Sequence, residues 1–132
     1  MAARSNAPIE MFAVKGAEEV YRAVVSRLRG RIGSKKVVED TKQTCVHIIS
    51  GEGSPAYAGL HPRKGAVLIN IRLQSPLKSP RIRKAEQVSR NRCHCELLVS
   101  SVAEVDDQLI GWLEEASQLA SEGKDREKRQ SD

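Results

Sequence analysis

The segment at residues 66–73, AVLINIRL, most restricts what this chain can fold into. Asn70 and Arg72 alternate in it with the apolar set Val67, Ile69, Ile71 and Leu73. Because successive side chains of a strand point to opposite faces, this two-residue period predicts a strand with one apolar and one polar face. The apolar face must be covered by a second layer. We therefore expect a central or near-central strand at residues 66–73.

Two more segments have the alternation of strands. Residues 44–50, TCVHIIS, are rich in β-branched residues, and one face of the predicted strand carries Cys45, His47 and Ile49. Residues 93–100, CHCELLVS, have an apolar side chain at every second position, namely Cys93, Cys95, Leu97 and Val99. We expect Cys93 and Cys95 to face the core, because they continue the face of the two aliphatic residues.

The remaining strand signals are shorter. Residues 56–60, AYAGL, predict a short strand that stops at His61-Pro62, because proline cannot donate to a sheet ladder. Residues 36–40, KVVED, predict a fifth strand. Residues 75–92 are polar, and we expect a connection there that holds one helical turn where Pro80 follows Ser79.

Two segments have the period of amphipathic helices. Residues 17–32 repeat apolar side chains every three or four positions, and Gly30 or Gly33 is expected to end the helix. Near the other end, Ser101 and Glu104 have the spacing of a capping box, which predicts that a helix starts there. Its apolar stripe is Val102, Val105, Leu109, Leu113 and Ala116.

These elements predict one α+β domain with two layers. A mostly antiparallel sheet of four or five strands packs against an N-terminal and a C-terminal helix. The chain of 132 residues suits a single domain, which we place at residues 10–121 between disordered tails at 1–9 and 122–132. The uncovered sheet face is expected to carry Asn70, Arg72, His94 and Glu96.

Composition narrows the functional classes. The four aromatic residues are Phe12, Tyr21, Tyr57 and Trp112, too few to serve both the core and a base-stacking platform. No apolar run approaches the roughly 20 residues that span a bilayer, and the first residues lack a secretory signal. We therefore expect a cytoplasmic protein without membrane contact, whose three cysteines are reduced. The sequence leaves the oligomeric state open.

Several short motifs together resemble a known group of proteins. Residues 80–82, Pro-Arg-Ile, are followed by Arg92-x-His94 at the start of a strand, and then by the residues at 101–107 and 112–116. This arrangement resembles a family of small bacterial domains of unknown function, over roughly residues 11–120. Members occur alone or appended to longer proteins, some of them nuclease-like. The resemblance implies the α+β fold and carries over no catalytic residue.

The cysteines and histidines invite two chemical interpretations. Cys45, His47, Cys93 and Cys95 could hold zinc if their two strands were neighbours, but side chains two apart on a strand lie roughly 6–7 Å apart, unlike the usual zinc knuckle. A cysteine nucleophile would need His47 or His61 as its base, because His94 points away from Cys93 and Cys95. No orienting third residue is evident. We expect core cysteines, no metal or cofactor, and no enzymatic activity.

A basic segment is the main functional signal. Positive residues crowd positions 78–92, and others lie near them if this segment folds back over the sheet. The candidate contacts to phosphate are Arg63, Lys64, Arg72, Lys78, Arg81, Arg83, Lys84, Arg90 and Arg92. With a formal net charge of +5, they favour a partner that is a polyanion, foremost a nucleic-acid backbone bound without strong sequence specificity. The alternatives are an acidic protein surface, an interaction module that uses the open sheet face or a strand edge, and a simple solvated loop.

Overall fold

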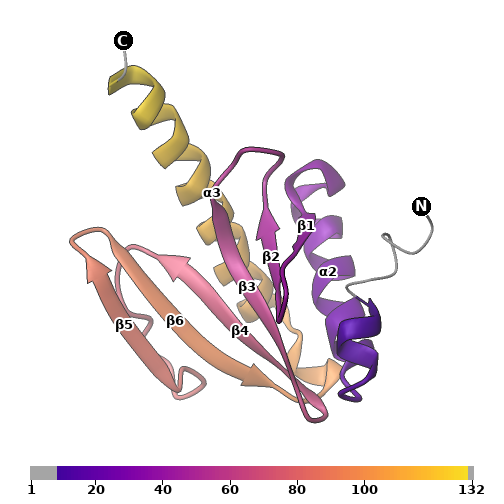
Figure 1. Ribbon diagram of the computed structural model, residues 1–132. Helices are drawn as coiled ribbons and strands as arrows, with labels where there is room; N and C mark the ends of the chain where they lie inside the picture. Colours follow the sequence, from indigo (N-terminus) through magenta and orange to yellow (C-terminus); the bar gives the residue numbers. More distant parts are fainter. Residues whose placement is uncertain (1–8, 131–132) are drawn as a thin grey trace.

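The computed structural model describes residues 9–130 of the chain, and the side chains of residues 9–121. Six antiparallel strands form one sheet in the order β1-β2-β3-β4-β6-β5, and helices cover one of its faces (Figure 1). The strands are β1 (Val38–Thr41), β2 (Val46–Ile49), β3 (Ala56–Arg63), β4 (Ala66–Leu73), β5 (Lys84–Ser89) and β6 (Arg92–Val99). The expected two-layer α+β fold is confirmed, with six strands in place of four or five.

The helical layer consists of two long helices, one short helix and two 3-10 turns. The long helices are α2 (Glu18–Ile32) and α3 (Asp107–Gln130). Residues 9–13 form a short helix before α2, and the 3-10 turns are η1 (Ser34–Lys36) and η2 (Val102–Glu104). The face of the sheet that points away from α2 and α3 is called the open face below.

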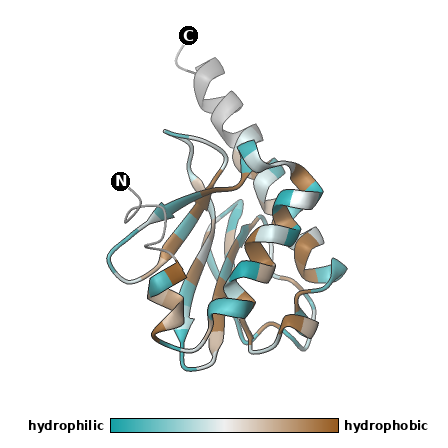
Figure 2. Ribbon diagram, turned by 90° about the vertical axis from the view of Figure 1, so that its right-hand side faces the viewer, coloured by the Kyte–Doolittle hydropathy of each residue, from teal (hydrophilic) through white to brown (hydrophobic). Residues whose placement is uncertain are grey.

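Strand β4 lies inside the sheet, as its alternation predicts. Its helix-facing side chains are at most 3% exposed, and they are Val67, Ile69, Ile71 and Leu73. Strand β6 continues this apolar layer with Cys93, Cys95, Leu97 and Val99, all at most 1% exposed. Burial of each large aliphatic side chain stabilises the fold by about 1.5–3 kcal/mol. Hydrophobic and hydrophilic stretches alternate along the strands in Figure 2.

Helix α2 confirms the N-terminal amphipathic helix. Its apolar stripe is buried against the sheet, and Tyr21 stacks on Phe12 with ring centroids 4.2 Å apart. Gly33 ends the helix with φ of 95°, a backbone conformation that residues with a Cβ rarely adopt. The amide of Gly33 donates to the carbonyl of Arg29.

The expectation that the third strand stops at His61-Pro62 was wrong. Strand β3 runs through both residues to Arg63, and Pro62 pairs with Val67 of β4. On its other side β3 pairs with β2 only as far as Leu60. Pro62 therefore lies where that side of the strand has no partner, and its missing N–H interrupts no ladder.

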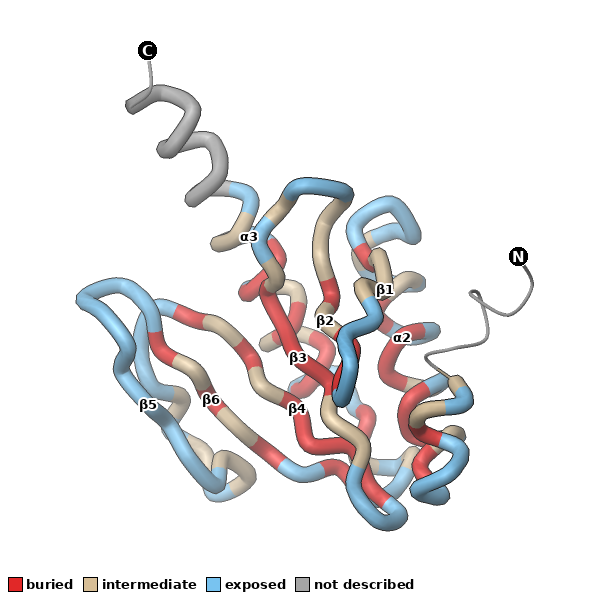
Figure 3. The backbone as a smooth tube through the Cα atoms, viewed as in Figure 1, coloured by how far each residue is buried: buried red, intermediate tan, exposed pale blue. Residues whose placement is uncertain are grey.

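The interpretation of residues 75–92 as a connection with a helical turn was also wrong. Residues 84–89 form β5, which pairs with β6 at the edge of the sheet. All six of its residues are exposed, so no apolar alternation marked it as a strand (Figure 3). Ser79 begins a tight turn in which its hydroxyl accepts from the amide of Arg81, at 3.2 Å.

The C-terminal helix starts later than the capping box predicts. The Ser101 and Glu104 box is present, but it caps the 3-10 turn η2. Helix α3 begins at Asp107, and the carboxylate of Asp106 accepts from the amide of Leu109 at 3.0 Å. A hydrogen bond from the third helical amide to the residue before the helix is the usual N-cap geometry, so Asp106 is the cap of α3.

The two expected tails fall mostly outside the described part of the chain. Residues 1–8 lie outside the described residues. Helix α3 extends to Gln130, and the side chains beyond residue 121 are not described, so a disordered tail at 122–132 stays a prediction.

Removal of the α3 cap should destabilise the protein measurably. Asp106→Ala is expected to lower the free energy of unfolding by about 1–2 kcal/mol, because the amide of Leu109 loses its acceptor. Asp107→Ala removes the same charge one residue later and should change stability by less than about 0.5 kcal/mol. Urea unfolding followed by far-ultraviolet circular dichroism measures both variants. Equal losses in the two would show that charge, and not capping, is responsible.

Candidate anion-binding cleft

Strands β3 and β4 separate at one end of the sheet. Their pairing ends at Ala58 and Ile71. Beyond that point β3 stays paired with β2, as far as Ala56, while β4 stays paired with β6, as far as Leu73. The two halves of the sheet diverge there, and α3 passes behind the gap (Figure 1).

Tyr57 accounts for this separation. The register of β2 against β3 shifts so that Ile48 pairs with Ala58 and Ile49 with Ala56, which leaves Tyr57 without a partner residue on β2. Such a bulge turns an extra side chain toward one face and increases the local twist. The phenol of Tyr57 is buried, donates to the carbonyl of Lys36 at 2.6 Å, and also hydrogen-bonds Ser117 of α3.

A cleft of about 470 Å³ occupies the gap. We call it the Arg72 cleft. Its polar lining consists of Ser54, Arg72, Gln74, Asn91 and Arg92, and its apolar lining includes Tyr57, Leu73, Ala116, Leu119 and Ala120. Pockets of about 300–1,000 Å³ that combine apolar walls with a few polar groups are typical of small-molecule sites. Both charged residues of the lining are arginines.

Arg72 lies half-buried at the end of β4 and bridges the gap. Its Nη1 donates to the carbonyl of Ala56 on β3 at 3.1 Å, across the point where the ladder has ended. Its Nε is buried and has no partner among the described residues. Burial, and then the positive charge of Arg92, lower the pKa of Arg72 from its usual value. The site therefore holds two cations close enough to repel each other.

The β5–β6 turn that carries Arg92 is held in place by Gln87. Its side-chain Nε2 lies within hydrogen-bonding distance of three carbonyl oxygens, those of Arg92 and Gln74 at 3.1 Å and that of Ser89 at 2.7 Å. This amide ties the turn to the end of β4. Arg92 and Asn91 therefore enter the cleft from a fixed backbone.

All three histidines of the chain lie on the open face, a grouping that the sequence analysis did not predict. His47 is on β2, His61 on β3 and His94 on β6, and the first two flank Gly59. A Cβ at Gly59 would lie 3.3 Å from His61 Nε2 and 3.7 Å from His47 Cδ2. The grouping follows from strand register, in which His47 pairs with Gly59. A sequence without known pairing cannot show it.

The environment of the open face keeps these imidazoles uncharged. Partial burial lowers the pKa of each histidine below the usual 6.5. The positive charge of Arg72 lowers the pKa of His47 and of His94 further, and the charge of Arg63 does the same for the pKa of His61. Near pH 7 the open face therefore presents neutral rings beside the Arg72 cleft.

The structure separates the nine cations predicted to contact phosphate. Arg81 points toward α3, where it pairs with Asp106 at 2.9 Å and lies over Trp112 at 5.8 Å. Lys84 pairs with Glu86 of the same strand at 3.9 Å. The other seven have no carboxylate partner among the described side chains, and they are Arg63, Lys64, Arg72, Lys78, Arg83, Arg90 and Arg92.

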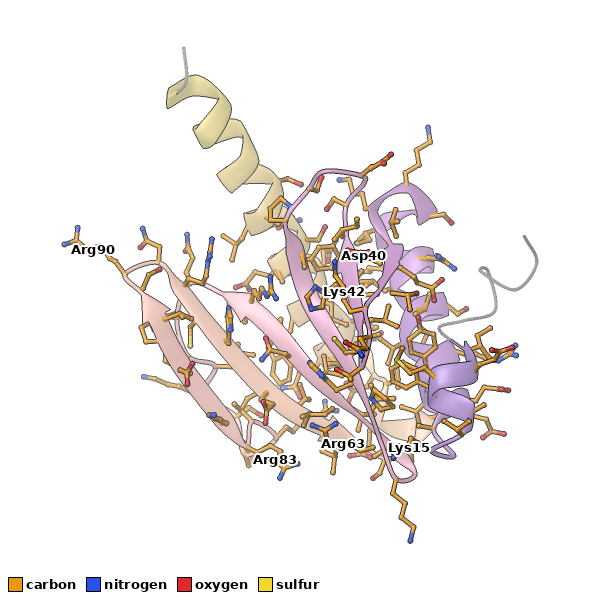
Figure 4. The ribbon with its side chains drawn as sticks, in the orientation of Figure 1. Lys15, Asp40, Lys42, Arg63, Arg83 and Arg90 are labelled. Atoms are coloured by element: carbon orange, nitrogen blue, oxygen red, sulfur yellow. The ribbon has the colours of Figure 1, made fainter. Side chains whose placement is uncertain are left out.

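Most of these seven lie at two ends of the open face. Arg63 ends β3, Lys64 lies in the β3–β4 turn, and Arg83 precedes β5 at the same end (Figure 4). Arg72, Arg90 and Arg92 lie at the opposite end, beside the cleft. Lys78 is exposed in the loop between β4 and β5.

The zinc hypothesis required neighbouring strands, which the topology does not provide. Strands β3 and β4 lie between β2, which carries His47, and β6, which carries Cys93 and Cys95. Three strand spacings amount to about 14 Å. Cys93 and Cys95 face the core, as expected, with their sulfurs 4.0 Å apart, and burial raises the pKa of Cys93. Among the described residues no three histidine, cysteine or acidic side chains are placed to share a metal ion.

Comparison with known proteins gives one match. The model of a family described as "Domain of unknown function (DUF5655)" matches residues 13–120. No curated protein and no solved structure shows significant similarity to the chain. Within the described part of the chain, no helix has the length and apolar character needed to cross a membrane.

The histidine pKa values can be tested directly. In a proton NMR titration of the imidazole signals, all three midpoints should fall below 6.5, because burial and nearby arginines disfavour the charged rings. The histidines of the unfolded chain bind protons more readily than those of the folded protein. The free energy of unfolding should therefore decrease as pH falls below about 7 toward 5.

A variant with His47, His61 and His94 changed to glutamine provides the control for stability. Its free energy of unfolding should change little between pH 7 and pH 5, because the remaining carboxylates titrate at lower pH. Midpoints at or above 6.5 in the native protein would contradict this description of the open face.

Proposed function

The chain belongs to the family described as "Domain of unknown function (DUF5655)", and from its charge distribution we propose that it is a cytoplasmic, non-enzymatic module that binds polyanions. The partner that fits best is the backbone of a nucleic acid, bound without strong sequence preference. The observation that carries this proposal is the set of seven cations that lack a carboxylate partner among the described side chains.

These cations differ from several arginines of the helical layer. Arg22 pairs with Glu18, Arg29 with Glu39 and Arg31 with Glu114. Around the open face, by contrast, positive charge is left over at the turns. Cations without a carboxylate partner keep their positive charge available to attract phosphate, and binding releases the counterions of the phosphate.

The placement of the cations favours an extended partner. Strand β6 has eight residues, so the two basic ends of the open face lie about 25 Å apart at about 3.3 Å per residue. Acidic Glu86 and Glu96 lie between these ends. A polymer that bridges the two ends gains contacts at both, whereas one small anion cannot. Backbone contacts of this kind carry no sequence information.

The exposed strand β5 supports a second candidate function. It forms one edge of the sheet, and all of its residues are exposed. A partner strand could add to this edge, which is a common mode of protein recognition. Lys84 and the irregular register between Gln87 and Ser89 are features that also protect edges against such pairing. Sedimentation velocity over a range of concentrations would reveal self-association through this edge.

Fluorescence anisotropy with a labelled generic duplex tests the first proposal. Affinity should fall steeply with salt, with a logarithmic slope of about 0.9 per phosphate contact. The variant R63Q/K64Q/R83Q removes one basic end and should reduce the slope by roughly 2–3. Arg81 is left unchanged, because it stabilises the start of α3.

The matched control is K35Q/K36Q, which removes two exposed charges from η1. It should change the slope by less than 1, since η1 lies outside both basic ends. Equal slopes in wild type and R63Q/K64Q/R83Q, or binding no tighter than that of a neutral protein at low salt, would reject the polyanion proposal. The interaction module would then be the better explanation.

A further inference from the structure

We propose that the Arg72 cleft is a binding site for a phosphomonoester. The phosphate lies between Arg72 and Arg92, and the rest of the ligand packs against Tyr57 and α3. The proposal concerns one small ligand and does not depend on binding of a polymer.

Charge complementarity carries the choice of ligand. The two arginines are the charged residues of the cleft lining, so the site offers two positive charges. A phosphomonoester carries about −1.5 to −2 at pH 7, whereas a carboxylate or an internal phosphodiester carries a single charge. Of these three groups, only the phosphomonoester neutralises both guanidinium groups. Two cations brought together without an anion repel each other, and a bound dianion removes that repulsion.

The geometry of Arg72 suits an anion better than a purely structural role. A guanidinium has five N–H donors, and the bridge to Ala56 uses Nη1. Its Nε has no partner among the described residues, although it is buried. A half-buried arginine with donors to spare is expected to gain strongly from a phosphate, because charge-assisted bonds strengthen away from water.

The remaining lining indicates an apolar or aromatic portion in the ligand. On the α3 side the wall consists of Ala116, Leu119 and Ala120. Gln74 and Asn91 add amide groups near the arginines. The volume of about 470 Å³ is sufficient for one ligand of nucleotide size and too small for a duplex.

Two sources could supply this chemistry. One is a free nucleoside monophosphate, and the other is the phosphorylated end of a nucleic-acid strand. Both present the same terminal phosphate and an adjacent ring.

Isothermal titration calorimetry with adenosine 5′-monophosphate is the first test, and adenosine is the matched ligand without phosphate. We expect saturable binding of the monophosphate and at least about tenfold weaker binding of adenosine. Arg92→Gln should weaken binding of the monophosphate about tenfold or more. Lys35→Gln removes one exposed positive charge from η1, outside the cleft lining, and should leave the affinity within about twofold.

A second variant keeps every charge. Ala120→Phe places a large side chain on the half-exposed wall of α3 and should abolish binding by filling the apolar part of the cleft. Thermal melting of each variant confirms that it is folded. If Ala120→Phe fails to fold, Leu119→Ala, which enlarges the same wall, should alter the affinity without affecting charge.

The two ligand sources are separated with a short single strand that carries either a 5′-phosphate or a 5′-hydroxyl. Preference for the phosphorylated strand over the free nucleotide assigns the site to strand ends, and the reverse preference assigns it to the small molecule. No binding of either phosphomonoester at millimolar concentration, or equal losses in Arg92→Gln and Lys35→Gln, would overturn the inference. Monophosphate binding without duplex binding would support the cleft and reject the polyanion proposal.

Discussion

The inward turn of Tyr57 is the constraint on which the functional end of this molecule depends. Its phenol is buried and donates to the carbonyl of Lys36, so the side chain cannot return to the open face without losing that bond. The extra residue forces β3 out of register with β2 and away from β4. The gap, its exposure of α3, and the bridge from Arg72 to Ala56 all follow from that displacement.

The same end of the sheet concentrates positive charge. Arg72 lies near the end of β4 at the gap, and the return of the chain through β5 and β6 brings Arg90 and Arg92 beside it. The lining of the cleft contains no acidic residue among the described part of the chain. The proposed polyanion site around the open face and the proposed phosphomonoester site in the cleft both rest on this excess of positive charge.

Sequence reasoning predicted the parts of the fold that apolar periodicity specifies. Strands β4 and β6 and helix α2 repeat buried side chains at fixed intervals, and hydrophobic burial enforces those intervals. Strand β5 could not be found this way, because its stability comes from pairing with β6 and none of its side chains is buried. The start of α3 was misplaced because two capping signals, at Ser101 and Asp106, lie close together and the first caps only η2.

The candidate site was only partly predictable for a similar reason. Arg72 and Arg92 were named from charge alone, but their convergence depends on which strands pair and where a ladder ends. The grouping of His47, His61 and His94 depends equally on long-range register. Arg81 was predicted to contact phosphate, yet it binds the carboxylate of Asp106 and the carbonyl of Glu104. Residue types suggested which side chains could bind an anion, but the pairing of the strands determines which of them lie together.

Side-chain hydrogen bonds at both ends of strand β5 affect the entropy cost of ligand binding. Arg81 ties the preceding loop to η2 and to the first turn of α3, and Gln87 ties the following turn to Gln74 at the end of β4. With both ends held, the backbone that carries Arg92 has little freedom left to lose when an anion arrives. Ordering costs usually consume part of the affinity of a surface loop. Here the hydrogen bonds of Gln87 hold the backbone of the turn before any anion binds, so ligand binding has mainly to order side chains.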